Sequence, residues 1–374
     1  MCKFVVNLSD VLDNFNKIKS TLDKNVKVCV VVKANAYGFG MPKIVNLLKN
    51  RADFFAVARL SEFWEYKKLK VELPCLILSP LYGNNLKVAI KNGAHITLSS
   101  SCDLTEVDSL AKKMGVVANV HLKIDTGMAR FGYTSLTVIK QLLKQLKKCK
   151  NIKLFGCYSH FADSQNEERT VYQREQFERA KKLIQKSRFK DVVFHIASSK
   201  ASVVKNNQYD MVRLGIDLYY REGNSHAFEC DIVEIKLLKA GSLIGYGGSY
   251  KLEKDTYVAV CSAGYADGVN RLLSNNWQVL INNKRHNIIG SICMDSFMVD
   301  LGQTSAKVGD RVIIFGKNAK SSICVCEMAD KCDTIIYEIF TSISNRVKRV
   351  YKWRNNASNN RQIPCEKAGV VRYV

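Results

Sequence analysis

The sequence has no long apolar run and no amino-terminal signal segment. Its longest apolar runs, such as residues 28–32, fall far short of the roughly 18–20 residues that a membrane-spanning helix needs. The start of the chain, MCKFVVNLSDVLDN, has no apolar core of the kind that marks a secretory signal. We therefore expect a cytoplasmic protein that does not bind membranes.

Regular cysteine spacing is also missing. The 13 cysteines are an odd number, and they do not form the repeated pairs of a disulfide framework. Cys324, Cys326 and Cys332 are close in sequence, but neither a histidine pair nor a second C-x-x-C stands nearby to complete a zinc site. The sequence predicts reduced thiols in a cytosol and no metal site.

Acidic residues are scarce relative to basic ones. The chain has 34 Asp and Glu residues against 57 Lys and Arg residues, a net charge of +23. Such a surplus attracts polyanions, so a nucleic-acid-binding protein is one alternative. Because the lysines are spread along the chain and no nucleic-acid-binding motif is present, we interpret the surplus as a lysine-rich surface and expect no nucleic-acid partner.

Eight short runs rich in β-branched residues recur in the first two thirds of the 374-residue chain, mostly separated by stretches with helical periodicity. They cover residues 26–32, 54–58, 74–79, 95–99, 118–124, 153–159, 192–196 and 211–214. Buried strands that alternate with helices pair in parallel. Eight such units predict an amino-terminal (β/α)8 barrel, which we assign to residues 1–230.

The pattern changes after residue 230. Helical stretches thin out, and β-type runs cover residues 232–238, 257–261, 277–281, 288–293, 297–301 and 310–315. Asn282-Asn283 and Gly247-Gly248 predict turns, and residues 325–331 predict one helix. The sequence therefore predicts a separate, mainly β domain over residues 231–374.

Polar residues follow several of the predicted barrel strands, where the reacting groups of such barrels collect. They are Lys33, Lys123, Asp125, Arg130, His160, His195, Ser198, Ser199, Arg213 and Gly215. Lys33 ends an apolar run, and desolvation lowers the pKa of a lysine and supplies the free amine needed for a Schiff base. The set suits capture of an anion and covalent handling of a carbonyl or amine.

These residues lie in motifs that resemble those of the bacterial alanine racemases. VVKANAYGFG resembles the segment to which that family attaches pyridoxal 5′-phosphate. The motifs that follow in the family's order are HLKIDTGMARFG, GCYSHFA, HIASS, MVRLGID, IGYGGSY, AGYADGVNR, GSICMD, VGDRVIIFG and TIIYEIFTSISNRVKRVY. The resemblance implies a fold type III isomerase that interconverts L- and D-alanine and supplies D-alanine for peptidoglycan. It also implies a homodimer in which the β domain of one subunit contributes to its partner's active site.

The resemblance assigns two catalytic bases. Lys33 would hold the cofactor as an aldimine and act as one base, and Tyr246 of the partner subunit would act as the other. A racemisation needs bases on opposite faces, because one removes the α-proton and the other returns it from the far side. Arg213 would point at the pyridine nitrogen and, since it stays protonated, leave that nitrogen unprotonated. His160 would hold Arg213.

The remaining roles follow in the same way. Arg130 would contact the substrate carboxylate, and Lys123 would carry a carbamate that orders Arg130. The backbone N–H of Met294 from the partner subunit would bind the same carboxylate, and Tyr265 would narrow the substrate entrance. The phosphate would be held by Tyr37, Ser199, Gly215, Ile216 and Tyr337.

The chain departs from the family's usual motifs at several positions. They are Phe39 for His, Ser198 for Asn, Tyr220 for Gly, Gly245 for Ser, Ser291 for Arg and Ser296 for Gln. Ser291 takes a charge out of the access corridor, so a broader racemase that accepts serine, lysine or arginine is an alternative.

Two other pyridoxal phosphate classes are also alternatives. Decarboxylases of a related fold lack the tyrosine that Tyr246 supplies in its Tyr-Gly context. Non-catalytic carriers usually lack a β domain, which residues 231–374 would form. Both features favour the racemase.

Overall fold

The computed structural model describes residues 2–187, 189–317 and 321–354. These residues form two compact units. One holds residues 12–36 and 40–219, and the other holds the described residues up to Val11, Tyr37–Phe39 and those from Tyr220 on. Residues 355–374, which belong to the predicted β domain, lie outside the described residues.

The first unit is the predicted barrel. Its sheet has the order β8-β7-β6-β5-β4-β3-β2-β9, and every neighbouring pair is parallel. The strands are β2 (Lys27–Val31), β3 (Phe54–Val57), β4 (Cys75–Ile77), β5 (His95–Leu98), β6 (Ala118–Lys123), β7 (Ile152–Tyr158), β8 (Val193–His195) and β9 (Met211–Leu214). Beyond β8, a parallel bridge between Ser198 and Arg213 nearly closes the ring. The fold prediction is confirmed.

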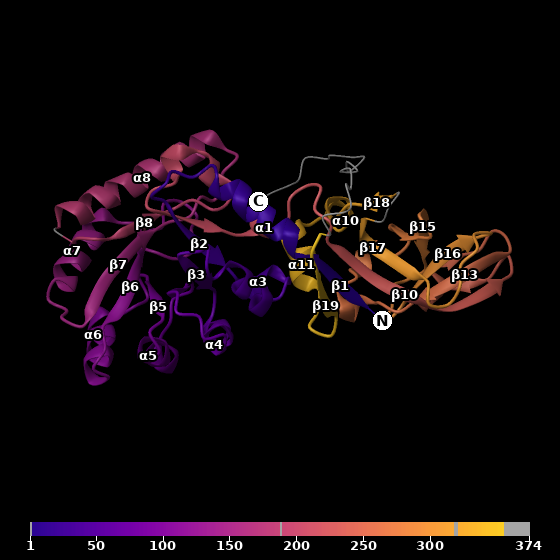
Figure 1. Cartoon of the computed structure of the whole chain (residues 1–374), viewed down its shortest axis with the longest axis horizontal. Helices are drawn as coiled ribbons and strands as arrows, with labels where there is room; N and C mark the ends of the chain where they lie inside the picture. Colours follow the sequence, from indigo (N-terminus) through magenta and orange to yellow (C-terminus); the bar gives the residue numbers. More distant parts are fainter. Residues whose placement is uncertain (1, 188, 318–320, 355–374) are drawn as a thin grey trace. The chain divides into compact units, whose positions relative to one another are not determined.

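Helices follow most barrel strands and flank them (Figure 1). They are α3 (Met41–Leu48), α4 (Leu60–Lys68), α5 (Gly83–Lys91), α6 (Leu104–Lys113), α7 (Leu136–Leu146) and α8 (Glu167–Lys186). In α7 the buried residues are Ile139, Leu142, Leu143 and Leu146, spaced so that one stripe faces inward. The Ser135 hydroxyl accepts the Val138 N–H and caps the start of this helix.

The second unit is the mainly β domain. Its large sheet has the order β18-β17-β14-β15-β16-β13-β10-β1-β19, and a further pairing of β10 with β17 closes six of these strands into a ring. Its strands are β10 (Ala227–Leu238), β13 (Thr256–Cys261), β14 (Gln278–Ile281), β15 (Lys284–Ile289), β16 (Phe297–Gly302), β17 (Arg311–Lys317), β18 (Ser322–Ile323), β1 (Lys3–Asn7) and β19 (Lys348–Lys352). A separate two-stranded sheet pairs β11 (Leu243–Ile244) with β12 (Tyr250–Lys251). The helices are α10 (Val325–Lys331) and α11 (Ile336–Ser342).

One predicted turn is explained by backbone geometry. Asn282 and Asn283 have φ angles of 49° and 67°, and they form the two-residue connection between β14 and β15. A two-residue hairpin with both central φ angles positive matches strand twist, and asparagine tolerates that conformation better than most residues.

The start of the chain differs from the sequence analysis, which assigned residues 1–11 to the barrel. β1 instead pairs antiparallel with β10 and parallel with β19, so Phe4 lies opposite Phe228 and Arg349. The aromatic ring of Phe4 packs 5.1 Å from Phe39 and 6.0 Å from Phe340. The first strand is therefore part of the core of the β unit.

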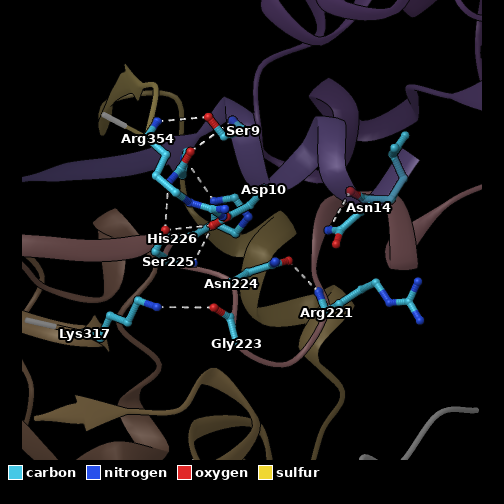
Figure 2. Close-up of polar contacts among 12 residues, drawn as sticks. Ser9, Asp10, Asn14, Arg221, Gly223, Asn224, Ser225, His226, Lys317 and Arg354 are labelled. Carbon is cyan, nitrogen blue, oxygen red and sulfur yellow. Dashed lines mark hydrogen bonds and ion pairs between the residues drawn. The ribbon is translucent and has the colours of Figure 1, made fainter. Parts of the chain in front are cut away.

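Polar contacts around the buried carboxylate of Asp10 hold this amino-terminal segment in place (Figure 2). The carboxylate of Asp10, which is 1% exposed, accepts hydrogen bonds from the backbone N–H (2.6 Å) and hydroxyl (2.8 Å) of Ser225 and pairs with Arg354. The N–H of Arg354 also donates to the hydroxyl of Ser9 at 2.9 Å. These bonds join the residues after β1 to those before β10 and after β19.

Three further observations concern the described part of the chain. No helix in it is both long and apolar enough to cross a membrane. Its twelve cysteines are free thiols. No group of three or more His, Cys, Asp or Glu side chains in these residues is arranged to hold a metal ion.

Candidate active site

Lys33 stands where the first barrel strand changes into a left-handed turn. The short helix α2 (Lys33–Tyr37) has positive φ angles at Ala34 (51°), Asn35 (53°) and Ala36 (54°). Left-handed backbone costs a non-glycine residue about 1–2 kcal/mol, so this turn depends on contacts from outside it. Strain of this kind concentrates at functional sites.

Glu62, at the start of α4, supplies one of these contacts. Its Oε1 accepts the backbone N–H of Ala34 at 2.7 Å. Its Oε2 accepts the N–H groups of Ala58 at 2.7 Å and Arg59 at 3.0 Å. One carboxylate therefore joins the lysine-bearing turn to the start of a helix.

The environment of Lys33 favours a neutral amine. Burial lowers the pKa of Lys33, and the positive charges of Arg130 and Arg213 lower it further, whereas Glu62 opposes the shift. A neutral lysine amine is a nucleophile that can form an imine with a carbonyl.

Asp125 organises the loop that carries Arg130. Its Oδ1 accepts the N–H groups of Gly127 (3.0 Å), Met128 (2.9 Å) and Ala129 (3.2 Å), and its Oδ2 accepts that of Arg130 (3.1 Å). Burial raises the pKa of Asp125, but these hydrogen bonds outweigh burial and leave the pKa below its ordinary value. The Asp-x-x-x-x-Arg spacing thus fixes the loop and leaves the exposed Arg130 side chain available at the barrel rim.

Lys123 is a buried lysine surrounded by other cations. It is 2% exposed, and its Nζ donates to the carbonyl of Ile124 at 2.8 Å. Burial, followed by the charge of Arg213, lowers the pKa of Lys123 from 10.5 to about 7; Asp125 raises it and Arg130 lowers it. A large fraction of this amine is therefore neutral near pH 7.

Arg213 is held by neutral acceptors. It is 4% exposed, and its Nη2 lies 2.7 Å from the carbonyl of Ser159 and 3.0 Å from Nδ1 of His160. Its Nη1 lies 2.8 Å from Nδ1 of His195. Burial and the charge of Arg213 hold the pKa of both imidazoles well below the ordinary range, so each stays neutral and accepts from the guanidinium.

Small residues line the end of β9. The hydroxyl of Ser199, which is 4% exposed, accepts the N–H of Gly215 at 2.8 Å. Ile216 begins α9 (Ile216–Tyr219) directly after Gly215. Backbone N–H groups and a hydroxyl in this arrangement suit a phosphate group.

The barrel thus brings eight predicted site residues to the carboxyl ends of its strands. They are Lys33, Lys123, Arg130, His160, Ser199, Arg213, Gly215 and Ile216. The electrostatic influence of both arginines on the pKa of Lys33 agrees with their gathering at one rim.

Tyr37 and Tyr337 form a pair within the β unit. Tyr37 is 8% exposed, and the centroid of its ring lies 6.2 Å from that of Tyr337 in α11. The next residue, Gly38, has a φ of 87°, and a Cβ there would lie 2.2 Å from the carbonyl oxygen of Phe340. Only glycine permits this close approach, which explains the Tyr-Gly sequence.

The other predicted residues of the β unit are exposed. Tyr246 begins η3 (Tyr246–Gly248) and is 74% exposed, and Tyr265 begins η4 (Tyr265–Asp267) and is 45% exposed. Met294 is 53% exposed, and its carbonyl accepts the N–H of Ala266 at 3.0 Å. The turn of Tyr265 and the loop of Met294 are therefore neighbours.

Arg346 strengthens this arrangement. Its Nε lies 2.9 Å from Oδ1 of Asp267, and its Nη2 lies 2.7 Å from Oδ1 of Asp295. It therefore joins the turn that carries Tyr265 to the loop that carries Met294.

Three of the departures from the resembled motifs have local explanations. Phe39 is fully buried, with ring centroids 4.9 Å from His226 and 5.0 Å from Phe340. Gly245 has φ 72° and ψ −174°, a conformation almost restricted to glycine. The Ser291 hydroxyl donates to the carbonyl of Tyr246 at 3.3 Å, so it contacts the turn that carries the predicted second base.

Comparison with known proteins agrees with this geometry. Residues 6–222 match the family model of the alanine racemase N-terminal domain, and residues 226–351 match that of the C-terminal domain. Alanine racemase 2 of Caldanaerobacter subterraneus subsp. tengcongensis is 36% identical over 366 residues, which cover 93% of this chain and 94% of that protein.

The chain belongs to the alanine racemase family. The structure of alanine racemase from Clostridium difficile 630 has a TM-score of 0.88 at 31% identity and covers 95% of this chain and 96% of that one. That of Bacillus anthracis alanine racemase with bound L-Ala-P has a TM-score of 0.86 at 27% identity and covers 97% and 96%. The chain is accordingly an isomerase of a family that depends on pyridoxal 5′-phosphate.

The barrel residues fit this cofactor. Lys33 offers an amine with a lowered pKa to the aldehyde. The hydroxyl of Ser199 and the start of α9 suit its phosphate, and Arg213 supplies a permanent donor.

The sequence analysis missed several residues that support this site. Glu62 lies on a helix, where a lone glutamate usually faces water, and its only signal is its position three residues after Arg59 at a helix start. Arg346 lies in the last of the family-like motifs, but no role was assigned to it. For both residues, no sequence pattern identified the groups that they contact.

Proposed function

We propose that this protein interconverts L- and D-alanine by a two-base reaction. The observation that carries the proposal is Lys33, an amine with a lowered pKa in a strained turn, at the same barrel rim as Arg130 and Arg213. Relatives named alanine racemase, and a solved relative described with bound L-Ala-P, support alanine as the substrate.

Lys33 and Tyr246 would move the α-proton. When bound, the cofactor draws electron density away from the α-carbon of the amino acid, which makes the α-proton removable. Lys33 would anchor the cofactor and then serve as the base on one face of the substrate. Tyr246 would serve on the opposite face, so the proton returned there inverts the configuration.

Arg213 would control the ring nitrogen of the cofactor. A guanidinium stays protonated, so it donates a hydrogen bond to that nitrogen without transferring a proton. His160 accepts from Arg213 and keeps it in place. Ser199, Gly215, Ile216, Tyr37 and Tyr337 would bind the phosphate.

Arg130 would bind the substrate carboxylate together with the N–H of Met294. We also propose that Lys123 carries a carbamate. Its lowered pKa gives a neutral amine that can attack the carbon of CO₂, with formation of an N–C bond and loss of a proton from the nitrogen. The product is an anion near Arg130 and Arg213, where a cation is disfavoured.

The active enzyme would be a homodimer. Tyr246, Tyr265 and Met294 are 74%, 45% and 53% exposed in this chain, although apolar and catalytic side chains need a partly dry environment to act. A barrel site in one subunit that is completed by the β unit of its partner, of which β1 is a part, would meet this need. We place the reaction in the cytoplasm, where the free thiols would stay reduced, and propose that it supplies D-alanine for peptidoglycan.

A D-amino-acid assay with and without added cofactor tests the proposal. Lys33→Ala should lose the visible absorbance of bound cofactor, and Tyr246→Phe should keep it but lose most turnover in at least one direction. Tyr257→Phe, which changes an exposed tyrosine of β13, is the matched control and should behave as wild type. Cofactor binding without racemisation by the wild type would overturn the proposal. Faster turnover of serine, lysine or arginine would overturn only the choice of alanine.

A further inference from the structure

Three buried histidines form a continuous row inside the barrel. Nδ1 of His95 lies 3.0 Å from Nε2 of His121, and Nδ1 of His121 lies 3.1 Å from Nε2 of His195. Nδ1 of His195 then lies 2.8 Å from Nη1 of Arg213. The three side chains come from β5, β6 and β8, and they are 5%, 0% and 0% exposed. The row therefore connects the barrel interior to Arg213.

The chemistry of Arg213 sets the direction of every hydrogen bond in the row. A guanidinium only donates, so Nδ1 of His195 must accept and its Nε2 must carry the hydrogen. That hydrogen goes to Nδ1 of His121, whose Nε2–H in turn donates to Nδ1 of His95. All three rings then hold their hydrogen on Nε2.

The imidazoles are also kept neutral. Burial holds the pKa of His121 and His195 well below the ordinary range, with His95 and Arg213 adding to the shift for His121, and Arg213 and His121 for His195. Burial, with a smaller effect of Lys153, lowers the pKa of His95 to about 4. A neutral ring has one donor and one acceptor, which is what each position in the row requires.

The surrounding strands make room for the row. A Cβ at Gly156 on β7 would lie 2.3 Å from Nδ1 of His121, so any larger residue would displace this ring. The ring of Tyr158 stacks on His195 with centroids 5.0 Å apart and planes 4° apart. Barrel interiors are usually filled by branched apolar side chains. A row of three polar rings, with a glycine on a neighbouring strand that leaves space for one of them, therefore requires an explanation.

We infer that the row His95–His121–His195 positions Arg213, which makes His95 and His121 positioning residues although neither touches the guanidinium. The inference rests on the proposed function, in which Arg213 meets the pyridine nitrogen. Without an acceptor at residue 95, His121 can carry its hydrogen on Nδ1 instead of Nε2. This Nδ1–H would face the Nε2–H of His195, so two donors would oppose each other. If His195 relieved this by moving its hydrogen to Nδ1, that hydrogen would face the donors of Arg213.

Nitrogen NMR of the cofactor-loaded enzyme tests the direction of the row. The chain has six histidines, so ¹⁵N-histidine labelling gives few signals to assign. We expect the Nε2–H form for His95, His121 and His195 in the wild type. A hydrogen on Nδ1 of His195, or a charged ring in the row at neutral pH, would overturn the inference.

His95→Phe tests the positioning role. Phenylalanine can pack against Phe54 and Phe155, which lie 5.3 and 4.5 Å from the present ring by centroid, but it offers no acceptor. We expect a change in the His195 nitrogen signals, a shift in the visible absorbance of bound cofactor and a fall in kcat of about tenfold, the scale of one lost buried hydrogen bond.

Two variants complete the test. His95→Asn places an amide oxygen near the former Nδ1 and should restore the His195 signals and the absorbance. His286→Leu removes a histidine of the β unit, which contacts the Asp300 carbonyl, and should leave both unchanged. If His95→Phe does not fold, His95→Leu takes its place.

The outcomes separate the two proposals. A stability loss in His95→Phe with wild-type His195 signals and absorbance would mean that the row only fills the core, and the inference fails. The expected tautomers in the wild type and the expected changes in nitrogen signals and absorbance in His95→Phe, found together with no racemisation of alanine, would uphold the row while the proposed function fails.

Discussion

Shortening the side chain of Glu62 should loosen the turn that carries Lys33. Positive φ angles at Ala34, Asn35, Ala36 and Tyr37 together cost about 4–8 kcal/mol at 1–2 kcal/mol each. The bond from the Ala34 N–H to the Glu62 carboxylate returns about 1.5–3 kcal/mol, because hydrogen bonds to charged groups are worth that much.

Glu62→Asp distinguishes the contact of Glu62 with the turn from its contacts with the start of the helix. An aspartate at the same helical position can still bond the start of its helix, as Asp267 does with the N–H of Gly264 at 2.9 Å, but it is too short to reach Ala34 as well. We therefore expect the dissociation constant of the cofactor to rise about 10- to 100-fold while the unfolding free energy changes little. Glu62→Ala should show the same loss of affinity and lose about 0.5–2 kcal/mol of stability in addition.

Cofactor titration by absorbance and urea unfolding measure the two quantities separately. Glu65→Gln, an exposed change on the same helix, is the control and should alter neither. Wild-type affinity in Glu62→Asp would refute the reasoning, because the carboxylate would then serve only as a helix cap.

Three further changes have equally direct outcomes. Because the pKa of Lys123 is about 7, its amine is cationic below that pH and neutral above it. A carbamate signal from ¹³C-bicarbonate should therefore grow as the pH rises through about 7, and it should be absent in Lys123→Arg. An unmodified Lys123 at pH 8 would contradict this prediction. Asp125→Ala should raise the KM for alanine about tenfold with a smaller effect on kcat, because the loop that carries Arg130 loses its hydrogen bonds to this carboxylate. Equal falls in kcat and kcat/KM would instead place Asp125 in the chemical step. Gly245→Ser should cost about 1–3 kcal/mol in urea unfolding, since its φ of 72° and ψ of −174° suit glycine alone, and an unchanged midpoint would show that the turn adapts.

The sequence predicted what depends on local patterns. Every predicted barrel run overlaps a strand, because short buried strands between amphipathic helices leave a clear apolar signal. β1 was missed because its partners, β10 and β19, lie more than 200 residues away and nothing in KFVVN identifies them. The left-handed turn after Lys33 was missed because none of Ala34, Asn35 and Ala36 is a glycine, the residue that usually indicates positive φ angles.

The same distinction between local patterns and distant contacts applies to the site residues. Lys33, Arg130 and Arg213 lie at or after the ends of strands and in motifs, so the sequence alone singled them out as candidates. His160 was named in the same way, as the residue that holds Arg213. His95 and His121 were not named, because they lie inside apolar runs, where a histidine cannot be distinguished from a residue that simply fills the core. The direction of the histidine row follows only once Nδ1 of His195 is seen to face a guanidinium.

The charges at the barrel rim link the stability of the barrel to the binding of its ligands. The charges of Arg130 and Arg213 lower the pKa of both Lys33 and Lys123. The nearby carboxylate of Asp125 accepts hydrogen bonds from backbone N–H groups. A rim of this kind is destabilised by its own repulsion until anions enter it. In the proposed function the cofactor phosphate and the substrate carboxylate would supply those anions, so their binding should stabilise the barrel. The gain from mass action alone is about 2.7 kcal/mol at a hundredfold excess over the dissociation constant. The surplus of +23 over the whole chain is thus of two kinds, a dispersed lysine surface and a few basic side chains at the barrel rim whose repulsion anionic ligands would relieve.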